Sequence, residues 1–199
     1  MEARPKVVVI AGPNGAGKST TAPKIVRSAF GVEVFVNADT IARGLSAFAP
    51  EQVALAAGRV MLQRIRSLAA DVLSFAFETT LATRSFKPLL CDIRRQGYEL
   101  HLIFLWLPTA AMAVERVHSR VKAGGHSVPD DVIERRYKRG LENFFNLYRP
   151  IADSWLMLDN SGGSDPKPIA WRNLGGPLQI VGSGPWNSLR NRYEKDIFT

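Results

Sequence analysis

The sequence predicts an α/β fold, in which a parallel sheet of five or slightly more strands has helices on both faces. Two observations carry this prediction. Short β-branched or apolar runs alternate with longer helical stretches along the chain, which is typical of successive βαβ units. A glycine-rich loop follows the first run, and polar residues follow later ones. Ligands bind beyond the carboxyl ends of parallel strands, so these segments are expected to form one site.

The first half of the chain supplies three of the expected strands. Residues 7–10 are a continuous β-branched run of the kind found in buried strands. Pro50 suits the first turn of a helix, which the Ala- and Leu-rich residues after it continue. The expected elements are a strand at 7–10, a helix at 18–29, a strand at 32–36, a helix at 50–70 and a strand at 72–77.

The second half continues the alternation. The expected elements are a helix at 85–96, a strand at 100–107, a helix at 110–123, a loop at 124–129, a helix at 130–148 and a strand at 155–158. The Gly, Pro and Ser content then rises. Residues 161–199 are therefore expected to be an appendage packed on a domain of residues 1–160, with an extra edge strand at 178–181.

Composition and charge narrow the class of protein. The chain has 199 residues, of which 46% are hydrophobic and 22% charged, as in globular domains. A single cysteine, Cys91, excludes an intramolecular disulfide framework. The longest apolar runs are far shorter than the ~18 residues of a membrane span, and the N-terminus lacks the apolar segment of a secretory signal. We therefore expect a soluble cytoplasmic protein that does not contact membranes.

The formal net charge of +8 fits either a nucleic-acid surface or a pocket for anionic small molecules. No basic arm, RNP aromatic motif or zinc finger accompanies this charge. Arginines instead gather between Arg116 and Arg139, interleaved with acidic residues. A nucleic-acid partner is therefore not favoured.

The glycine-rich loop matches the phosphate-binding pattern G-x-x-x-x-G-K-[ST] in full, between an expected strand and an expected helix. Such a loop turns backbone N–H groups toward phosphate oxygens at a helix N-terminus. Lys18 is expected to bridge the β- and γ-phosphates of ATP, and the Ser19 hydroxyl to bind Mg²⁺. The expected nucleotide contacts are Gly12, Pro13, Asn14, Gly15, Ala16, Gly17, Lys18, Ser19 and Thr20, with Asn160 after the last strand. The fold is accordingly expected to be that of a P-loop NTPase.

Other motifs select a small kinase among P-loop proteins. Transporter ATPases with a similar loop carry an SGGQ-type signature and a strand ending in paired acids, and small GTPases carry an NKxD-type motif. None of these occurs in the chain. What remains is a kinase pattern, with acidic groups after the second and third strands and an arginine-rich helical lid.

The candidate acceptor residues follow those two strands. Asp39 can accept the proton of an acceptor hydroxyl or hold Mg²⁺ through water, although Asp also favours helix N-caps. Glu78 can grip acceptor hydroxyls or polarise the metal shell, or it can be a buried helix-capping residue. Asn37 and Thr79 complete the expected acceptor set.

Five arginines define the expected lid. Arg116 and Arg120 are four residues apart on one helix, and Arg135 and Arg139 repeat that spacing beyond a Gly-Gly pair. Guanidinium groups bind two phosphate oxygens at once, although a basic helix can also be simply solvated. Arg116, Arg120 and Arg136 are the expected catalytic arginines.

The ordered segments GPNGAGKST, VNADTIAR, FAFETTLA, RVKAGGHSVPDDVIERRYKRGLENF and MLDNS, within residues 7–161, resemble the zeta-toxin-like P-loop kinases. The likeness is greatest to their compact chromosomal branch, often labelled ABC-type ATPases. The resemblance implies ATP- and Mg²⁺-dependent phosphorylation of UDP-N-acetylglucosamine at its 3′-hydroxyl, and inhibition by an antitoxin protein. It also implies that Asp39 is the catalytic aspartate, Glu78 the acidic substrate-contacting residue, and Arg116 or Arg120 the first lid arginine.

The lid departs from the family pattern, because the second family arginine falls near His126 when the sequences are aligned on Pro129. Arg135 or Arg136 is then implied to supply its charge. Two other functions stay open, a nucleotide-binding regulatory module with little turnover and a polynucleotide 5′-hydroxyl kinase. Asp39 together with the lid arginines favours a kinase, because a regulatory switch needs neither.

Overall fold

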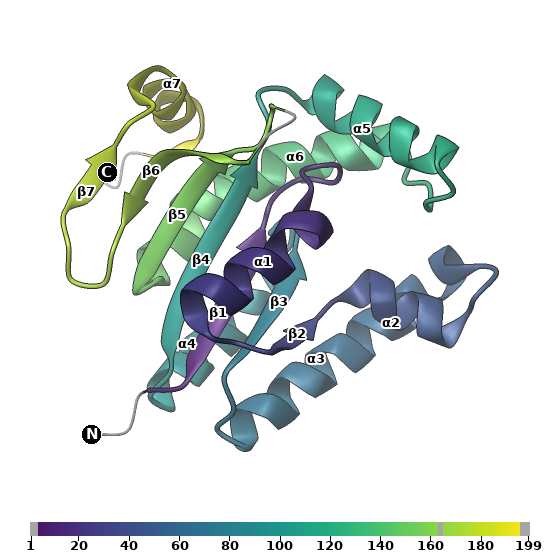
Figure 1. The fold of residues 1–199 in the computed structure, drawn as a ribbon, viewed down its shortest axis with the longest axis horizontal. Helices are drawn as coiled ribbons and strands as arrows, with labels where there is room; N and C mark the ends of the chain where they lie inside the picture. Colours follow the sequence, from purple (N-terminus) through teal and green to yellow (C-terminus); the bar gives the residue numbers. More distant parts are fainter. Residues whose placement is uncertain (1–3, 163–164, 196–199) are drawn as a thin grey trace.

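A seven-stranded sheet lies at the centre of the computed structural model, which describes residues 4–162 and 165–195 (Figure 1). The strand order is β2-β3-β1-β4-β5-β6-β7. The first five strands run parallel, and β6 and β7 are antiparallel to their neighbours. The strands are β1 (Lys6–Ala11), β2 (Val34–Val36), β3 (Phe75–Thr79), β4 (Glu99–Trp106), β5 (Ser154–Asp159), β6 (Lys167–Arg172) and β7 (Leu178–Ile180). The predicted P-loop α/β fold is confirmed.

Helices cover both faces of the parallel part of the sheet. In Figure 1, α1 lies in front of the sheet, and α4 and α6 lie behind it. The helices are α1 (Lys18–Phe30), α2 (Ala38–Leu45), α3 (Ala54–Ala70), α4 (Phe86–Arg95), α5 (Ala110–Lys122), α6 (Asp130–Asn143) and α7 (Ser183–Tyr193). β1 and β4 are buried along almost their whole length, as expected for strands covered on both faces.

Several element boundaries differ from the predicted ones. The third strand starts at Phe75 rather than residue 72, because Val72 adopts a φ of 56° in a turn after α3. The second strand starts two residues late, because the N–H of Val32 bonds to the end of α1. The helix expected at 130–148 ends at Asn143 and continues as the π-helical turn Phe144–Tyr148. The helix expected from Pro50 begins as a 3₁₀ turn before α3.

Three elements are absent from the sequence predictions, namely α2, β6 and α7. β6 pairs with β5 and thereby extends the sheet. α7 places the fully buried Trp186 against Trp155, with ring centroids 5.3 Å apart. The described part of residues 161–195 therefore packs on the sheet.

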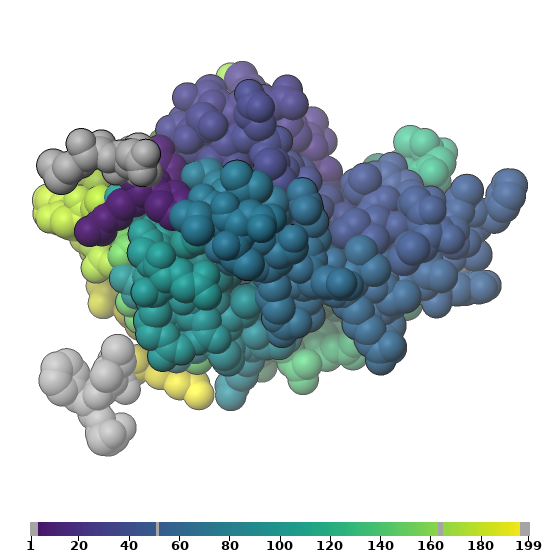
Figure 2. Space-filling model, turned by 90° about the horizontal axis from the view of Figure 1, so that it is seen from below, coloured from purple at the N-terminus to yellow at the C-terminus, as the bar shows by residue number. Residues whose placement is uncertain are grey.

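Two helical hairpins flank the sheet. One is formed by α2 and α3, and α2 with the start of α3 lies at the right of the body in Figure 2. The other is formed by α5, α6 and the loop between them, and is called the lid below (Figure 1). None of the helices in the described ranges combines the length and apolar character that a membrane crossing requires.

Candidate active site

The loop after β1 has the backbone of a phosphate-binding loop. Gly12, Gly15 and Gly17 have φ angles of 143°, 75° and 76°, which glycine adopts without steric cost. A Cβ on Gly12 would lie 2.3 Å from the carbonyl oxygen of Leu105, and one on Gly17 would lie 2.7 Å from Nδ2 of Asn160. The loop is therefore packed tightly against the ends of β4 and β5.

The ammonium group of Lys18 is buried between this loop and β3. Its Nζ donates to the carbonyl oxygen of Pro13 at 2.9 Å and lies 3.8 Å from Oε1 of Glu78. Burial lowers the pKa of Lys18, while the carboxylates of Glu78 and Asp39 act to raise it. The positive charge of Lys18 is thus held at the junction of the loop and the two acidic side chains.

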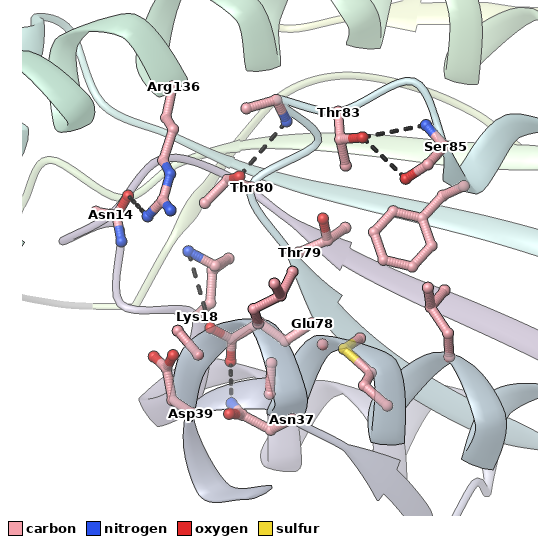
Figure 3. A pocket seen from close by; sticks show the side chains of 18 of the residues that line it. Asn14, Lys18, Asn37, Asp39, Glu78, Thr79, Thr80, Thr83, Ser85 and Arg136 are labelled. Atoms are coloured by element: carbon pink, nitrogen blue, oxygen red, sulfur yellow. Dashed lines mark hydrogen bonds and ion pairs between the residues drawn. The ribbon is translucent and has the colours of Figure 1, made fainter. Parts of the chain in front are cut away.

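Glu78 connects the phosphate loop to the start of α2 (Figure 3). Its Oε2 accepts hydrogen bonds of 2.9 Å from both Ser19 Oγ and Asn37 Nδ2. Hydroxyl and carboxylate oxygens are the ligands that Mg²⁺ prefers, so Ser19 and Glu78 fit a magnesium ion bound to phosphates. Thr20 lies exposed on the first turn of α1, one residue further on.

Asn37, and not Asp39, is the N-cap of α2. Its Oδ1 accepts a hydrogen bond from the backbone N–H of Thr40 at 3.0 Å, so the interpretation of Asp39 as the N-cap is wrong. Asp39 lies in the first turn, and its half-exposed carboxylate has Oδ2 3.9 Å from Nε2 of His126 in the lid. The carboxylate of Asp39 lies beside Lys18 and Glu78 in the lining of a pocket, which is described below (Figure 3).

The lid arginines reach different segments. The Nη1 of Arg136 lies 3.4 Å from Oδ1 of Asn14 in the phosphate loop. Burial lowers the pKa of Arg136, and the nearby Asp39 acts to raise it. Arg120 donates to the carbonyl oxygen of His126 at 3.1 Å. The charges of Arg120 and Arg136 both act to lower the pKa of Lys18.

Arg116 contacts the loop after β5. Its Nη1 and Nη2 donate to the carbonyl oxygens of Asn160 and Ser161 at 2.8 and 2.9 Å. The side chain of Asn160 in turn donates to the carbonyl oxygen of Ala16 at 2.7 Å. Arg116 therefore links the loop after β5 to the first lid helix, and Asn160 links the same loop to the phosphate loop.

A pocket of about 520 Å³ opens beside the phosphate loop. Its walls come from α2, α3, α6 and the loop between β3 and α4. Thr79 at the end of β3 and Thr80, Thr83 and Ser85 in that loop contribute hydroxyl groups (Figure 3). Of these, only Thr79 was predicted, and the frequent hydroxyl residues at the end of the strand and after it were the signal for the others.

The loop after β3 is held by α6 and the π-helical turn. Leu81 has a φ of 56°, and its carbonyl oxygen accepts a hydrogen bond of 2.7 Å from Nδ2 of the buried Asn143. The hydroxyl of Tyr148 donates to the carbonyl oxygen of Thr83 at 2.6 Å. A Cβ on Gly140 would lie 2.6 Å from the carbonyl oxygen of Thr80. These contacts fix the hydroxyl-bearing wall of the pocket relative to the second lid helix.

Comparison with known proteins gives one family and a set of similar structures. A sequence model of the zeta toxin family matches residues 1–153. An uncharacterized protein of Haemophilus influenzae is 27% identical over 134 residues, which make up 66% of this chain and 92% of that protein.

Solved structures of low sequence identity share the fold. The structure of AvrRxo1-ORF1:-ORF2 with ATP has a TM-score of 0.75 at 14% identity, and the match covers 99% of this chain and 66% of that one. A structure from the PezAT chromosomal toxin–antitoxin system of Streptococcus pneumoniae has a TM-score of 0.69 at 16% identity, covering 96% of this chain and 79% of that one. The chain thus spans just under two thirds of the length of the AvrRxo1 chain.

Proposed function

Because the chain belongs to the zeta toxin family of P-loop kinases, we propose that it transfers the γ-phosphoryl group of ATP to a hydroxyl group of a nucleotide sugar such as UDP-N-acetylglucosamine. One observation carries the proposal. Lys18, Asp39, Glu78 and Arg136 come from four different elements and meet where the phosphate loop opens into the 520 Å³ pocket. Positive side chains lie where the phosphates of ATP would bind, and carboxylates lie beside a pocket with room for a second substrate. This arrangement suits the transfer of a phosphoryl group from one bound substrate to another.

The phosphate loop and the lid form the ATP side of the proposed site. Backbone N–H groups of the phosphate loop and the ammonium of Lys18 hold the phosphates. Arg120 and Arg136 neutralise charge that spreads over the equatorial oxygens during transfer. Arg116 acts indirectly, since it holds the carbonyl oxygens after β5, and Asn160 borders the loop on that side.

Asp39 is the proposed general base. Its carboxylate lines the pocket from the first turn of α2 and can accept the proton of the attacking hydroxyl. Asn37, Glu78 and Thr79 line the same pocket and would orient the acceptor. Mg²⁺, held by Ser19 and through water by Glu78, would neutralise the β- and γ-phosphate oxygens.

The family also supports two proposals about the setting of the reaction. The AvrRxo1 structure contains ORF1 together with ORF2, and the PezAT structure comes from a toxin–antitoxin system. We propose that an antitoxin protein inhibits this chain as well. We place the reaction in the cytoplasm, where its substrate ATP is made.

A screen with radiolabelled ATP tests the proposed function. The chain is incubated with Mg²⁺ and with nucleotide sugars, nucleosides or 5′-hydroxyl oligonucleotides, and the labelled products are separated. We expect label in a nucleotide sugar, and none when Lys18→Ala replaces the wild type. Label only in an oligonucleotide, or in no acceptor at all, would contradict the proposal.

A further inference from the structure

Positively charged side chains outnumber negatively charged ones in the lining of the pocket. Two carboxylates, Asp39 and Glu78, line it together with Lys18 and four arginines. Both carboxylates act to raise the pKa of Lys18, which lies at the end of the pocket next to the phosphate loop. The arginines come from two opposite helices, Arg59 from α3 and the other three from α6 (Arg135, Arg136 and Arg139).

Two of these arginines have partners among the described side chains. Arg136 contacts Asn14 of the phosphate loop, and Arg135 lies 3.7 Å from Asp131 on its own helix. Among the side chains that the structure describes, which do not include that of Glu51, no carboxylate lies within 4.0 Å of the guanidinium of Arg59 or Arg139. Both of these exposed arginines line the pocket.

The hydroxyl wall between α3 and α6 also offers hydrogen-bond donors. The side-chain oxygens of Thr79 and Thr80 accept hydrogen bonds of 3.1 and 3.4 Å from backbone N–H groups two residues ahead. Since each of these oxygens already accepts a backbone bond, its hydroxyl hydrogen is left to donate to a ligand. The hydroxyl of Thr83 is paired with that of Ser85 at 2.8 Å. A ligand of this wall should therefore present acceptor oxygens.

We propose that Arg59 and Arg139 form a cationic clamp that selects an acceptor carrying a phosphate group apart from the hydroxyl that is phosphorylated. The inference rests on the proposed function and adds specificity residues to it. Guanidinium groups bind phosphate through paired, charge-assisted hydrogen bonds, and the threonine hydroxyls supply further donors. Leu55, Met61 and Phe86 give the same pocket an apolar surface for the body of the acceptor.

Calorimetry on the full chain, with the phosphate loop saturated by a non-hydrolysable ATP analogue and Mg²⁺, tests the clamp. The probes are N-acetylglucosamine 1-phosphate and free N-acetylglucosamine, which share the sugar and differ only in the phosphate group. Hydrogen bonds to charged groups contribute about 1.5–3 kcal/mol, or roughly 10- to 100-fold in affinity. We expect the uncharged sugar to bind at least about tenfold more weakly.

Single variants then test each arginine. Arg59→Gln and Arg139→Gln should each weaken binding of the charged probe by about tenfold or more, with the affinity for the ATP analogue kept within twofold. Arg66→Gln is the matched control, since Arg66 is exposed on α3 and does not line the pocket. Equal binding of both probes, binding of neither, or arginine variants that behave like the control would overturn the clamp.

Phosphoryl transfer on the same samples separates the clamp from the proposed function. Transfer to an uncharged acceptor that Arg59→Gln and Arg139→Gln leave unchanged would overturn the clamp and keep the kinase. Arginine-dependent binding of the charged probe without transfer to any acceptor would keep the clamp and overturn the kinase.

Discussion

The buried ammonium of Lys18 contacts two segments that ATP would meet, the phosphate loop and the acidic end of β3. We predict that Lys18→Ala weakens ATP binding at least tenfold while the chain stays folded, because the charge faces phosphates rather than the core. Calorimetry and circular dichroism measure the two effects. Lys24→Ala is the matched control, since Lys24 is exposed on the same helix. Unchanged ATP affinity in folded Lys18→Ala would contradict the assignment of the loop.

Asp153 stabilises the fold at a distance from the site. Burial acts to raise its pKa, but hydrogen bonds from Arg94 and from the N–H of Leu100 outweigh this and lower it. The carboxylate therefore contributes stability above the unfolded-state pKa of about 3.9, and this stability is lost as the pH falls through the lower folded-state pKa.

We predict that Asp153→Asn lowers the free energy of unfolding by about 1–3 kcal/mol at pH 7, and by progressively less below about pH 4. Urea unfolding of both proteins at several pH values measures this difference. The same difference at pH 2 and at pH 7 would show that the charge of Asp153 is not responsible.

At the scale of elements, the arginines of the two lid helices contact different loops. Arg136 contacts the phosphate loop, whereas Arg116 holds the carbonyl oxygens that follow β5. We predict that Arg136→Ala lowers kcat at least ~100-fold, a bound set below the roughly 10³–10⁵-fold contribution of arginine fingers, with little change in the Kd for ATP. Arg116→Ala should instead raise the Kd for ATP, because the β5 loop loses its anchor. Single-turnover rates and equilibrium binding separate the two variants, and identical profiles would contradict this division.

Local sequence patterns were sufficient to predict most helices and strands, but not to predict which groups the long side chains contact. The phosphate loop and both lid helices follow from glycine positions, charge and apolar runs. The spacing of Arg116 and Arg120 placed them on one helix, but their partners depend on tertiary contacts with the loop after β5 and with the lid loop. The position of Arg59 in the pocket lining could not be predicted, because nothing near it in the sequence indicates that α3 borders the pocket.

The three missed elements depend on packing rather than on local preference. β6 contains Pro168, which weakens its strand pattern. α7 begins at a Gly-Pro pair and becomes stable when Trp186 packs in the core. α2 has only eight residues, one of them glycine, and is marked in sequence mainly by Asn37 at its start.

At the scale of the whole molecule, an aromatic cluster joins the C-terminal elements to the sheet. The ring of Trp186 stacks on Trp155 and lies 5.4 Å from that of Phe145, and the Arg149 guanidinium lies over all three rings. These contacts attach α7 to the sheet, and the division into a domain of residues 1–160 and an appendage of residues 161–199 stays a prediction.

We predict that Trp186→Ala lowers the free energy of unfolding by about 3–5 kcal/mol, as large-to-small core substitutions do. ATP affinity of the folded variant should stay within twofold of wild type, because the cluster lies away from the pocket. Thermal unfolding and calorimetry provide the two values. A loss of ATP binding in fully folded Trp186→Ala would show that the appendage belongs to the site.

Single-turnover phosphoryl transfer by Asp39→Asn tests the central claim, that the pocket beside the phosphate loop is the acceptor site of a kinase. General base catalysis contributes about 10²–10⁴-fold, so the rate should fall at least ~100-fold while ATP affinity stays within twofold. Asp71→Asn is the matched control, because Asp71 is exposed at the far end of α3 and does not line the pocket. A transfer rate for Asp39→Asn within twofold of wild type would contradict the claim.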